Sequence, residues 1–517
     1  MSQASKLFIN TGLTYARMGV SIVIGLVATR IAFRYLGEEQ FGLYGVLAAA
    51  VAVVTAFSDG LAAACERNFA YAIGLRDDGD LQRLFVTAVM MVGGIAAVLM
   101  AGAALLGGVA AQLAGVEAAQ IGEAHLAIVC ITFGAAATGL GYPARALLTA
   151  HQNFLQTTLL DLGEAGLRLA VVLTLLLLPG GKIVYYAGLL ALVAAANTLA
   201  HIIIVRSLYA SPRFSFGAGS RGAAGVLLQY AGWETVNSLG SRIRLGGSQL
   251  VLTGFRLPRA ENAGFSLGQQ ASSYVATLGF AIRRAIAPAM VTLHARGQRE
   301  QFGLLVSAAS KLPMLVAVLA VVPFLLETEY LLKLWLGEVP AGAALLVRLF
   351  VIMIATDDLT RGHQIALSAV GRPGIMATAY CVSQGAGLLI GGLVMWLWRP
   401  EAWIVLASLT GAWIVAAVVV VLMYAGLTGL RAGQWARDVV GRVLLVYAGT
   451  VGLALVPLLM LPQGPVRLVL VGVATAVVLA GMGWVFGLSG AERSQVRAFA
   501  GRITGRFKGR FARQGAE

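Results

Sequence analysis

Residues 30–46 read RIAFRYLGEEQFGLYGV, in which four charged residues and three glycines separate two long apolar stretches. A comparable interruption, FRLPRAENAGF, occupies residues 255–265. When the sequence is shifted by 222 positions, Phe33-Arg34 aligns with Phe255-Arg256. Each interruption therefore reads as a tight turn between two helices, and the recurrence predicts that the chain contains two related halves.

The apolar stretches on both sides of these turns have the length of membrane-spanning helices. The 517 residues are 59% hydrophobic and 12% charged, whereas soluble domains carry roughly 25% charged residues. A bilayer-spanning helix needs about 20 apolar residues. We therefore predict an all-α polytopic membrane protein with about fourteen spans. The predicted spans cover residues 9–32, 41–66, 84–108, 122–144, 154–178, 183–205, 222–253, 262–288, 302–326, 341–369, 374–397, 402–425, 438–461 and 468–489.

The repeat continues beyond the two turns. With a shift of 219, residues 148–150 (LTA) align with 367–369 (LSA), and Gly166 aligns with Gly385. A nearly constant offset over six spans predicts a parallel repeat, because an even number of crossings returns each half to the same orientation. Parallel repeats are a transporter architecture with the substrate site between the halves. The expected divisions are a first lobe (1–210), a second lobe (211–430), two extra spans (431–490) and a basic tail (491–517).

The distribution of Lys and Arg predicts the orientation. If the N-terminus is cytoplasmic, 21 of the 38 basic residues lie in inside segments, seven in outside loops and ten within spans. Cytoplasmic loops are the ones enriched in Lys and Arg. We therefore expect both termini in the cytoplasm, and the formal charge of +15 needs no nucleic-acid partner. The basic tail could lie on anionic lipids, and it is a candidate docking segment for a polysaccharide polymerase and chain-length machinery.

Several spans carry polar residues that are unsuited to lipid, where a central charge costs about 2.5–3.5 kcal/mol. The first span of each half has a polar stripe at helical spacing, which predicts that both line one aqueous cavity. The candidate substrate-binding residues are Arg17, Glu234, Asn237, Arg242, Arg244, Gln269 and Arg284. The candidate ion-coupling residues, for Na⁺ or H⁺, are Asp59, Glu66 and Asp357.

Structural roles compete with these assignments. Glu164 and Arg168 are four residues apart and could pair within one helix, as could Asp357 and Arg361. Arg284 and its neighbour Arg283 could reach the membrane surface instead of the cavity. Cys65, Cys130 and Cys381 lie inside predicted spans without paired spacing, so we expect neither disulfides nor a metal site.

The basic residues within the spans are nine arginines and Lys311. A guanidinium group stays charged and binds phosphate oxygens through two parallel hydrogen bonds. Arginines at mid-depth beside Asn, Gln and Ser therefore favour a substrate that combines phosphate with many hydroxyls. They are poorly suited to a cationic drug.

The segments RYLGEEQFGLYG (34–45), FSDGLAAACERNFA (57–70) and ALSAVGRPGIMA (366–377) resemble the O-antigen-type, Wzx-like polysaccharide flippases of the multidrug/oligosaccharidyl-lipid/polysaccharide exporter superfamily. The resemblance covers residues 5–430. It implies two six-helix bundles arranged as a V, alternating access, and transfer of an undecaprenyl-pyrophosphate-linked oligosaccharide across the bacterial inner membrane by a monomer. Two extra C-terminal spans also occur in the related lipid II flippase.

A multidrug exporter and an enzyme are the two other functions that the sequence leaves to consider. A cation-coupled multidrug exporter of the same fold is the alternative, but that branch usually has an acidic residue in the first span, where this chain has Arg17. An enzyme is disfavoured, because the D-x-D-like segment RDDGD (76–80) lies in a short loop and every outer loop is short. No phosphate-binding G-x-x-x-x-G-K-[ST] segment is present in the sequence. We therefore expect a transporter and not an enzyme.

Overall fold

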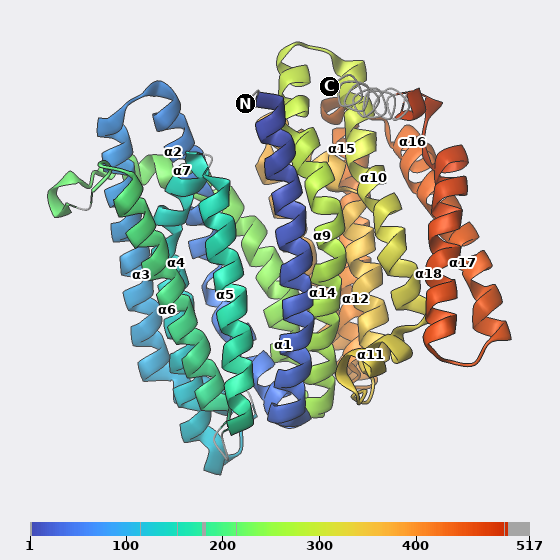
Figure 1. Cartoon of the computed structure of the whole chain (residues 1–517), viewed down its shortest axis with the longest axis horizontal. Helices are drawn as coiled ribbons and strands as arrows, with labels where there is room; N and C mark the ends of the chain where they lie inside the picture. The colour runs from blue at the N-terminus through green and yellow to red at the C-terminus, as the bar shows by residue number, and fades with distance from the viewer. Residues whose placement is uncertain are drawn as a thin grey trace, which may run out of the picture.

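The protein is a bundle of long helices (Figure 1). The computed structural model describes residues 3–113, 115–151, 153–177, 182–213, 215–490 and 492–494, and every regular element in these ranges is helical. The first half contains α1 (Gln3–Val54), α2 (Ala56–Leu75), α3 (Asp78–Leu113), α4 (Ile121–Ala150), α5 (Phe154–Thr174) and α6 (Lys182–Leu208). The second half contains α7 (Arg221–Arg242), a π-helical turn (Ile243–Gly247), α8 (Ser248–Gly254), α9 (Arg259–Ala295), α10 (Arg299–Leu326), α11 (Thr328–Leu336), α12 (Ala343–Asp358), α13 (Arg361–Ala369), α14 (Pro373–Leu397) and α15 (Ala402–Thr428). The chain continues through α16 (Ala432–Trp435), a second π-helical turn (Ala436–Gly441), α17 (Arg442–Met460) and α18 (Pro465–Met482).

The helix boundaries repeat along the chain. The first residues of α3 and α10 are 221 positions apart, those of α5 and α14 are 219 apart, and those of α6 and α15 are 220 apart. These offsets match the shifts that aligned the two halves in sequence. The predicted parallel repeat of two helical bundles is therefore confirmed.

The two lobes diverge toward the end of the molecule where α1 begins (Figure 1). Helices α2 to α6 form one lobe and α9 to α15 the other. The first helix of each half touches both lobes: α1 packs on α5 and α9, and α7 packs on α2 and α14. The lobes therefore meet along two helices that belong to neither lobe alone.

Helices α17 and α18 pack on α10 through a buried apolar cluster that includes Val318, Val446 and Val471. Two buried ion pairs fix this hairpin at its ends. Lys311 Nζ lies 2.7 Å from Glu492 Oε2, and Arg467 Nε lies 2.6 Å from Glu327 Oε1. The hairpin is therefore attached to the second lobe at both of its ends. Residues 495–517 of the predicted basic tail lie outside the described residues.

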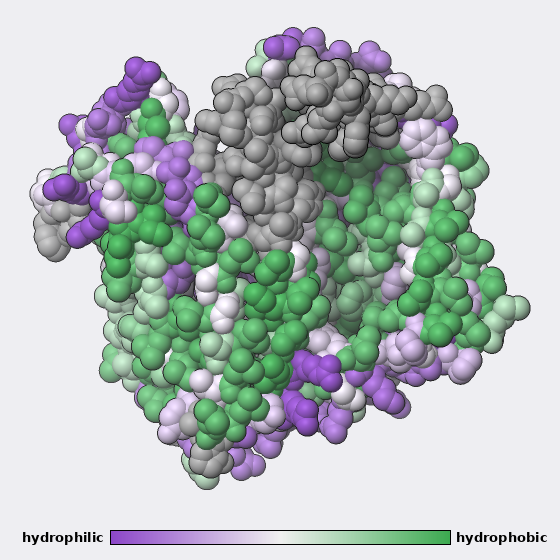
Figure 2. All heavy atoms as spheres, viewed as in Figure 1, coloured by the Kyte–Doolittle hydropathy of each residue, from purple (hydrophilic) through white to green (hydrophobic). Residues whose placement is uncertain are grey.

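The surface and the helix lengths are those of a multi-pass membrane protein. Figure 2 shows a hydrophobic band across the middle of the molecule, with hydrophilic residues above and below it. Nine helical segments in the described part of the chain are long and apolar enough to cross a membrane. The other predicted spans are helical but are interrupted by charges or breaks, as in α5, which carries Asp161, Glu164 and Arg168. The count of fourteen crossings stays a prediction.

The turn at 30–46 is smaller than the sequence suggests. The helix continues through this stretch except at Gly37, where φ is 75° and ψ is 168°. A positive φ is accessible to glycine at little cost, because glycine has no Cβ. A single residue therefore reverses the chain between the first two predicted spans, and the helix extends to Val54 before α2 begins.

Helices α2 and α7 lie so close that only glycine fits between them at Gly60. A Cβ at this position would lie 2.7 Å from the carbonyl oxygen of Ala231 and 2.9 Å from the backbone nitrogen of Thr235. Both atoms belong to backbone, so they cannot move aside as a flexible side chain could.

The variant Gly60→Leu is therefore expected to force α2 and α7 apart and to destabilise the fold by about 1–3 kcal/mol, as overpacking does. The fraction of purified protein that stays monodisperse after stepwise heating measures this effect. Gly74→Leu is the matched control on the same helix, because no heavy atom lies within 4 Å of a Cβ there. Equal heat resistance of the two variants would contradict the close packing.

Candidate functional site

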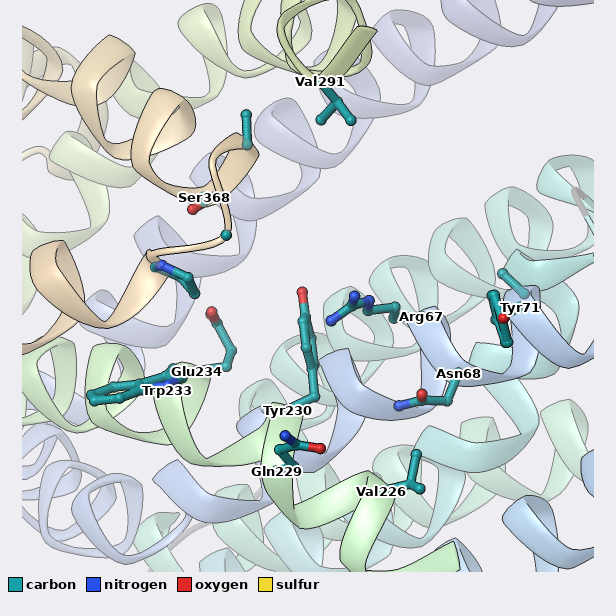
Figure 3. Close-up of a pocket in the computed structure, with 14 residues that line it drawn as sticks. Arg67, Asn68, Tyr71, Val226, Gln229, Tyr230, Trp233, Glu234, Val291 and Ser368 are labelled. Atoms are coloured by element: carbon teal, nitrogen blue, oxygen red, sulfur yellow. The ribbon is translucent and has the colours of Figure 1, made fainter. Parts of the chain in front are cut away.

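Two cavities lie where the lobes meet, one on each side of the middle of α7. The larger, which we call the vestibule, has a volume of about 1100 Å³ and lies toward the end of the molecule where α1 begins. The vestibule is lined by Arg67, Asn68, Ala70, Tyr71, Val226, Gln229, Tyr230, Trp233, Glu234, Val291, Ser368, Ala369, Gly371 and Pro373. Figure 3 shows Arg67, Tyr230 and Glu234 projecting into this opening from α2 and α7. Its volume slightly exceeds the roughly 300–1,000 Å³ of most small-molecule sites.

The second cavity, which we call the inner cavity, has a volume of about 410 Å³. Its polar lining includes Thr29, Tyr44, Arg242, Gln249, Ser266, Gln269, Gln270 and Ser273. Two pairs of these side chains are hydrogen-bonded: Thr29 Oγ1 donates to Gln270 Oε1 at 2.9 Å, and Gln249 Nε2 donates to Ser266 Oγ at 2.7 Å. Glu234 lines the vestibule and Arg242 lines the inner cavity, eight positions further along the helix, or about 12 Å.

An ion pair joins the lobes between these two cavities. Arg242 Nη2 on α7 lies 2.5 Å from Asp59 Oδ2 on α2, and the side chains are 32% and 25% exposed. The hydroxyl of Tyr142 on α4 donates to the other carboxylate oxygen of Asp59 at 3.2 Å. One predicted substrate-binding residue is thus bound to one predicted ion-coupling residue; both side chains are partly exposed, and Arg242 lines the inner cavity.

Arg244 faces the opposite way, into the second lobe. Its Nη1 lies 2.5 Å from Asp357 Oδ2, with the two side chains 9% and 2% exposed. Arg244 is not among the residues that line either cavity. The sequence placed Arg244 beside Arg242 in the cavity, whereas the structure places it in the interior of the lobe. Two positions on a helix differ by about 200° in direction, and Arg244 also lies in the π-helical turn.

The pair of Arg244 with Asp357 is part of a larger charged cluster. Arg361 lies 3.9 Å from Asp357 and 3.8 Å from Asp358, and Arg283 Nη1 lies 2.8 Å from Asp358 Oδ1. Arg283, for which the sequence left a surface position open, therefore turns into the second lobe. Three arginines surround two aspartates here, so the acidic groups are fully compensated within the protein.

The first lobe also pairs its half-buried acids internally. Glu164 and Arg168 form the bridge that the sequence allowed, at 2.6 Å, and Asn197 Nδ2 donates to the second carboxylate oxygen of Glu164 at 2.6 Å. Asp161 on the same helix pairs with Arg145 at 3.1 Å. Within the described residues, no group of three or more His, Cys, Asp or Glu side chains could hold a metal ion.

The remaining predicted residues are distributed over both lobes. Glu234 lines the vestibule and accepts a hydrogen bond from Asn237 Nδ2 at 3.3 Å, while Asn237 itself lines a small pocket beside Asp357. Gln269 lines the inner cavity. Glu66 is exposed on α2. Arg17 lies on α1 and Arg284 on α9, and their side chains lie outside the described part of the structure.

Sequence reasoning did not identify the aromatic residues of the vestibule. Tyr230 and Trp233 lie on the same face of α7 as Glu234, with Gln229 and Val226 beside them. Their spacing of three and four residues was available in the sequence, but aromatic residues in a membrane protein more often face lipid. Asp358 was also missed, because its partner Arg283 is 75 residues away in the chain.

Comparison with known proteins places this geometry in a family. Residues 7–294 match the sequence profile of the family described as "Polysaccharide biosynthesis protein". No curated protein sequence matches the chain.

Three solved structures illustrate the similarity in fold. The lipid II flippase MurJ in an inward closed conformation is 10% identical, with 93% of this chain and 98% of that chain covered and a TM-score of 0.68. An inward-facing MATE family multidrug resistance transporter of the MOP superfamily is 13% identical, with 79% and 94% covered and a TM-score of 0.65. A MOP superfamily transporter from Pyrococcus furiosus, described as having a binding pocket of reverse polarity, is 13% identical, with 81% and 95% covered and a TM-score of 0.61.

The chain thus shares its fold with these three structures, with the two-lobed helical arrangement expected from the sequence. The family profile covers more than half of the chain, from α1 to the end of α9. The chain therefore belongs to the family of polysaccharide biosynthesis proteins and is a multi-pass membrane protein with the fold of these solved structures.

Proposed function

We propose that the protein is a flippase that moves an undecaprenyl-pyrophosphate-linked oligosaccharide across the bacterial inner membrane. The vestibule receives the headgroup on the cytoplasmic side, where both termini lie in the proposed orientation. The isoprenoid tail stays in lipid beside the seam, by which we mean the surface along which α1 and α7 join the two lobes. Closure of the vestibule and opening of the opposite side then transfer the headgroup, and no covalent step takes place.

One observation carries the choice of an anionic, glycan-bearing substrate. Each of five acidic residues within the helical lobes is paired with an arginine, namely Asp59, Asp161, Glu164, Asp357 and Asp358. A cation-coupled drug exporter needs an excess of acidic groups along its cavity, whereas five acids are paired and the vestibule lining balances Glu234 with Arg67, so that function is disfavoured. An arginine at the seam can instead exchange its carboxylate for a phosphate, because both are bound by the same bidentate geometry.

The same pairing bears on energy coupling by Na⁺ or H⁺. Asp357 is buried against Arg244, so its charge is already compensated and a coupling cation would have to displace a guanidinium group. Asp59 pairs with a more exposed arginine and borders the seam. Of these two predicted coupling residues, Asp59 is the better placed.

Analysis of lipids from a deletion strain of the native host tests the proposed function. A flippase defect should cause one complete polyprenyl-pyrophosphate glycan to accumulate with its headgroup facing the cytoplasm, as measured by mass spectrometry and by protection from an external glycosidase. Expression of the wild-type chain should clear it. Normal glycan lipids in a strain that also lacks other members of the family, together with increased sensitivity to cationic drugs, would instead support the exporter.

A further inference from the structure

The indole ring of Trp233 lies flat on a glycine at the wall of the vestibule. A Cβ built on Gly374, at the start of α14, would lie 2.8 Å from each of three contiguous ring atoms, Cδ2, Cε2 and Cε3. Equal short distances to adjacent ring atoms mean that Gly374 faces the plane of the ring and not its edge. Trp233 is nevertheless 50% exposed and lines the vestibule. One face of the ring is therefore supported by backbone, while much of the rest is open.

Hydrogen-bonding groups on α7 and α2 line the same vestibule as this ring. Glu234 follows Trp233 directly, and Figure 3 shows Gln229 and Asn68 on the same side of the opening. The amide nitrogen of Asn68 donates to the carbonyl oxygen of Ala64 at 2.8 Å, which fixes the orientation of its carboxamide. A cavity wall that combines an apolar ring with a few amide and carboxylate groups is typical of sites for small polar ligands.

The single arginine in the lining is already engaged by an aromatic ring. The guanidinium carbon of Arg67 lies 4.4 Å from the centroid of the Tyr230 ring, a cation–π contact. This contact positions both side chains at the wall of the vestibule, opposite the turn that joins α13 to α14 (Figure 3). The lining thus holds one positive and one negative side chain, Arg67 and Glu234, and otherwise neutral groups.

From this arrangement we infer that the vestibule contains a sugar-binding subsite, in which a neutral pyranose ring stacks on Trp233 and its hydroxyls bond to Glu234 and Gln229. The inference rests on the proposed function and adds the chemistry of the sugar. The C–H groups on one face of a pyranose pack on an aromatic ring, and the equatorial hydroxyls point outward to acceptors and donors at its edge. A uronic acid is disfavoured, because its carboxylate would lie beside that of Glu234.

Equilibrium binding to the full chain in lipid nanodiscs, measured by native mass spectrometry, tests the subsite. The three probes are undecaprenyl pyrophosphate, the same lipid carrying N-acetylglucosamine, and the same lipid carrying glucuronic acid. We expect the N-acetylglucosamine lipid to bind about tenfold more tightly than either of the others, a difference of one decade in Kd. The variant Trp233→Leu should reduce this preference to within about twofold while leaving the affinity for undecaprenyl pyrophosphate unchanged.

Two further variants separate stacking from a general loss of structure. Gly374→Ala keeps the indole but pushes it out of its position, so it should also weaken the preference for the neutral sugar. Trp396→Leu removes an exposed tryptophan at the other end of α14, 73% exposed and outside the vestibule, and should change nothing. An unchanged preference in Trp233→Leu, or equal binding of the neutral and acidic lipids, would overturn the subsite. Failure of the wild type to bind any of the three lipids would overturn the proposed function and the subsite with it.

Discussion

Replacement of Arg242 by alanine is expected to slow translocation of the glycan lipid by about 30-fold. Truncating one member of a hydrogen-bonded charge pair costs about 2–5 kcal/mol, and the lower end applies because Arg242 is 32% exposed. Arg242 is the described arginine that both lines the inner cavity and pairs α7 with α2, so its loss removes the proposed phosphate ligand and leaves Asp59 without its cation. The rate of loss of a fluorescent glycan lipid from one leaflet of a proteoliposome measures the effect.

Replacement of the partner residue is expected to change substrate affinity and transport rate in different directions. Asp59→Asn removes the carboxylate that competes with phosphate for Arg242, so substrate affinity should increase while translocation slows, because release becomes harder. This split between affinity and rate would not follow from a purely structural role. Arg168→Ala is the control, since that residue pairs only within the first lobe and is 55% exposed. If Arg242→Ala and Arg168→Ala transported at the same rate, the seam arginine would have no part in transport.

Replacement of Arg244 by methionine is expected to destabilise the protein by about 3–5 kcal/mol, the cost of leaving one charge of a buried pair without its partner. Asp357 is 2% exposed, and its second cation, Arg361, is 3.9 Å away. Resistance to unfolding in a series of detergent and SDS mixtures measures the loss. Because Arg244 lines neither cavity, the surviving folded protein should bind glycan lipid normally.

The double variant Arg244→Met with Asp357→Leu provides the control. Apolar residues of similar volume often replace a buried ion pair at little cost, so most of the stability should return. A variant Arg244→Met that remained stable but lost lipid binding would show that Arg244 belongs to the substrate path, as the sequence alone suggested.

The sequence predicted the repeat and the position of the seam because both depend on local pattern. The offset of about 220 residues, the apolar periodicity and the polar face of the seventh span can all be read along the chain, and each has a counterpart in the helix bounds. Arg242 was identified because a charge at mid-depth is costly in lipid whatever its partner.

The partners themselves could not be predicted. Arg242 and Asp59 are 183 positions apart, and Arg244 and Asp357 are 113 apart. Helical spacing gives the direction of a side chain relative to its own helix, but not which lobe that direction faces. Arg242 and Arg244 therefore looked equivalent, although one bridges the lobes and the other is buried within a lobe. The contact between the Trp233 ring and Gly374 likewise could not be predicted, because the two residues lie in different helices.

The placement of α1 and α7 has a mechanical consequence. Each crosses from one lobe to the other, α1 between α5 and α9 and α7 between α2 and α14. Because each of these helices contacts both lobes, the lobes cannot separate unless the packing of α1 and α7 changes. Closure of one side and opening of the other would therefore involve rotation and sliding of closely packed helices at the contacts of α1 and α7. The backbone departs from α-helical geometry at two places on these helices. One is Gly37, where α1 reverses, and the other is the π-helical turn at Ile243–Gly247, which follows α7. Torsion would concentrate at these two places.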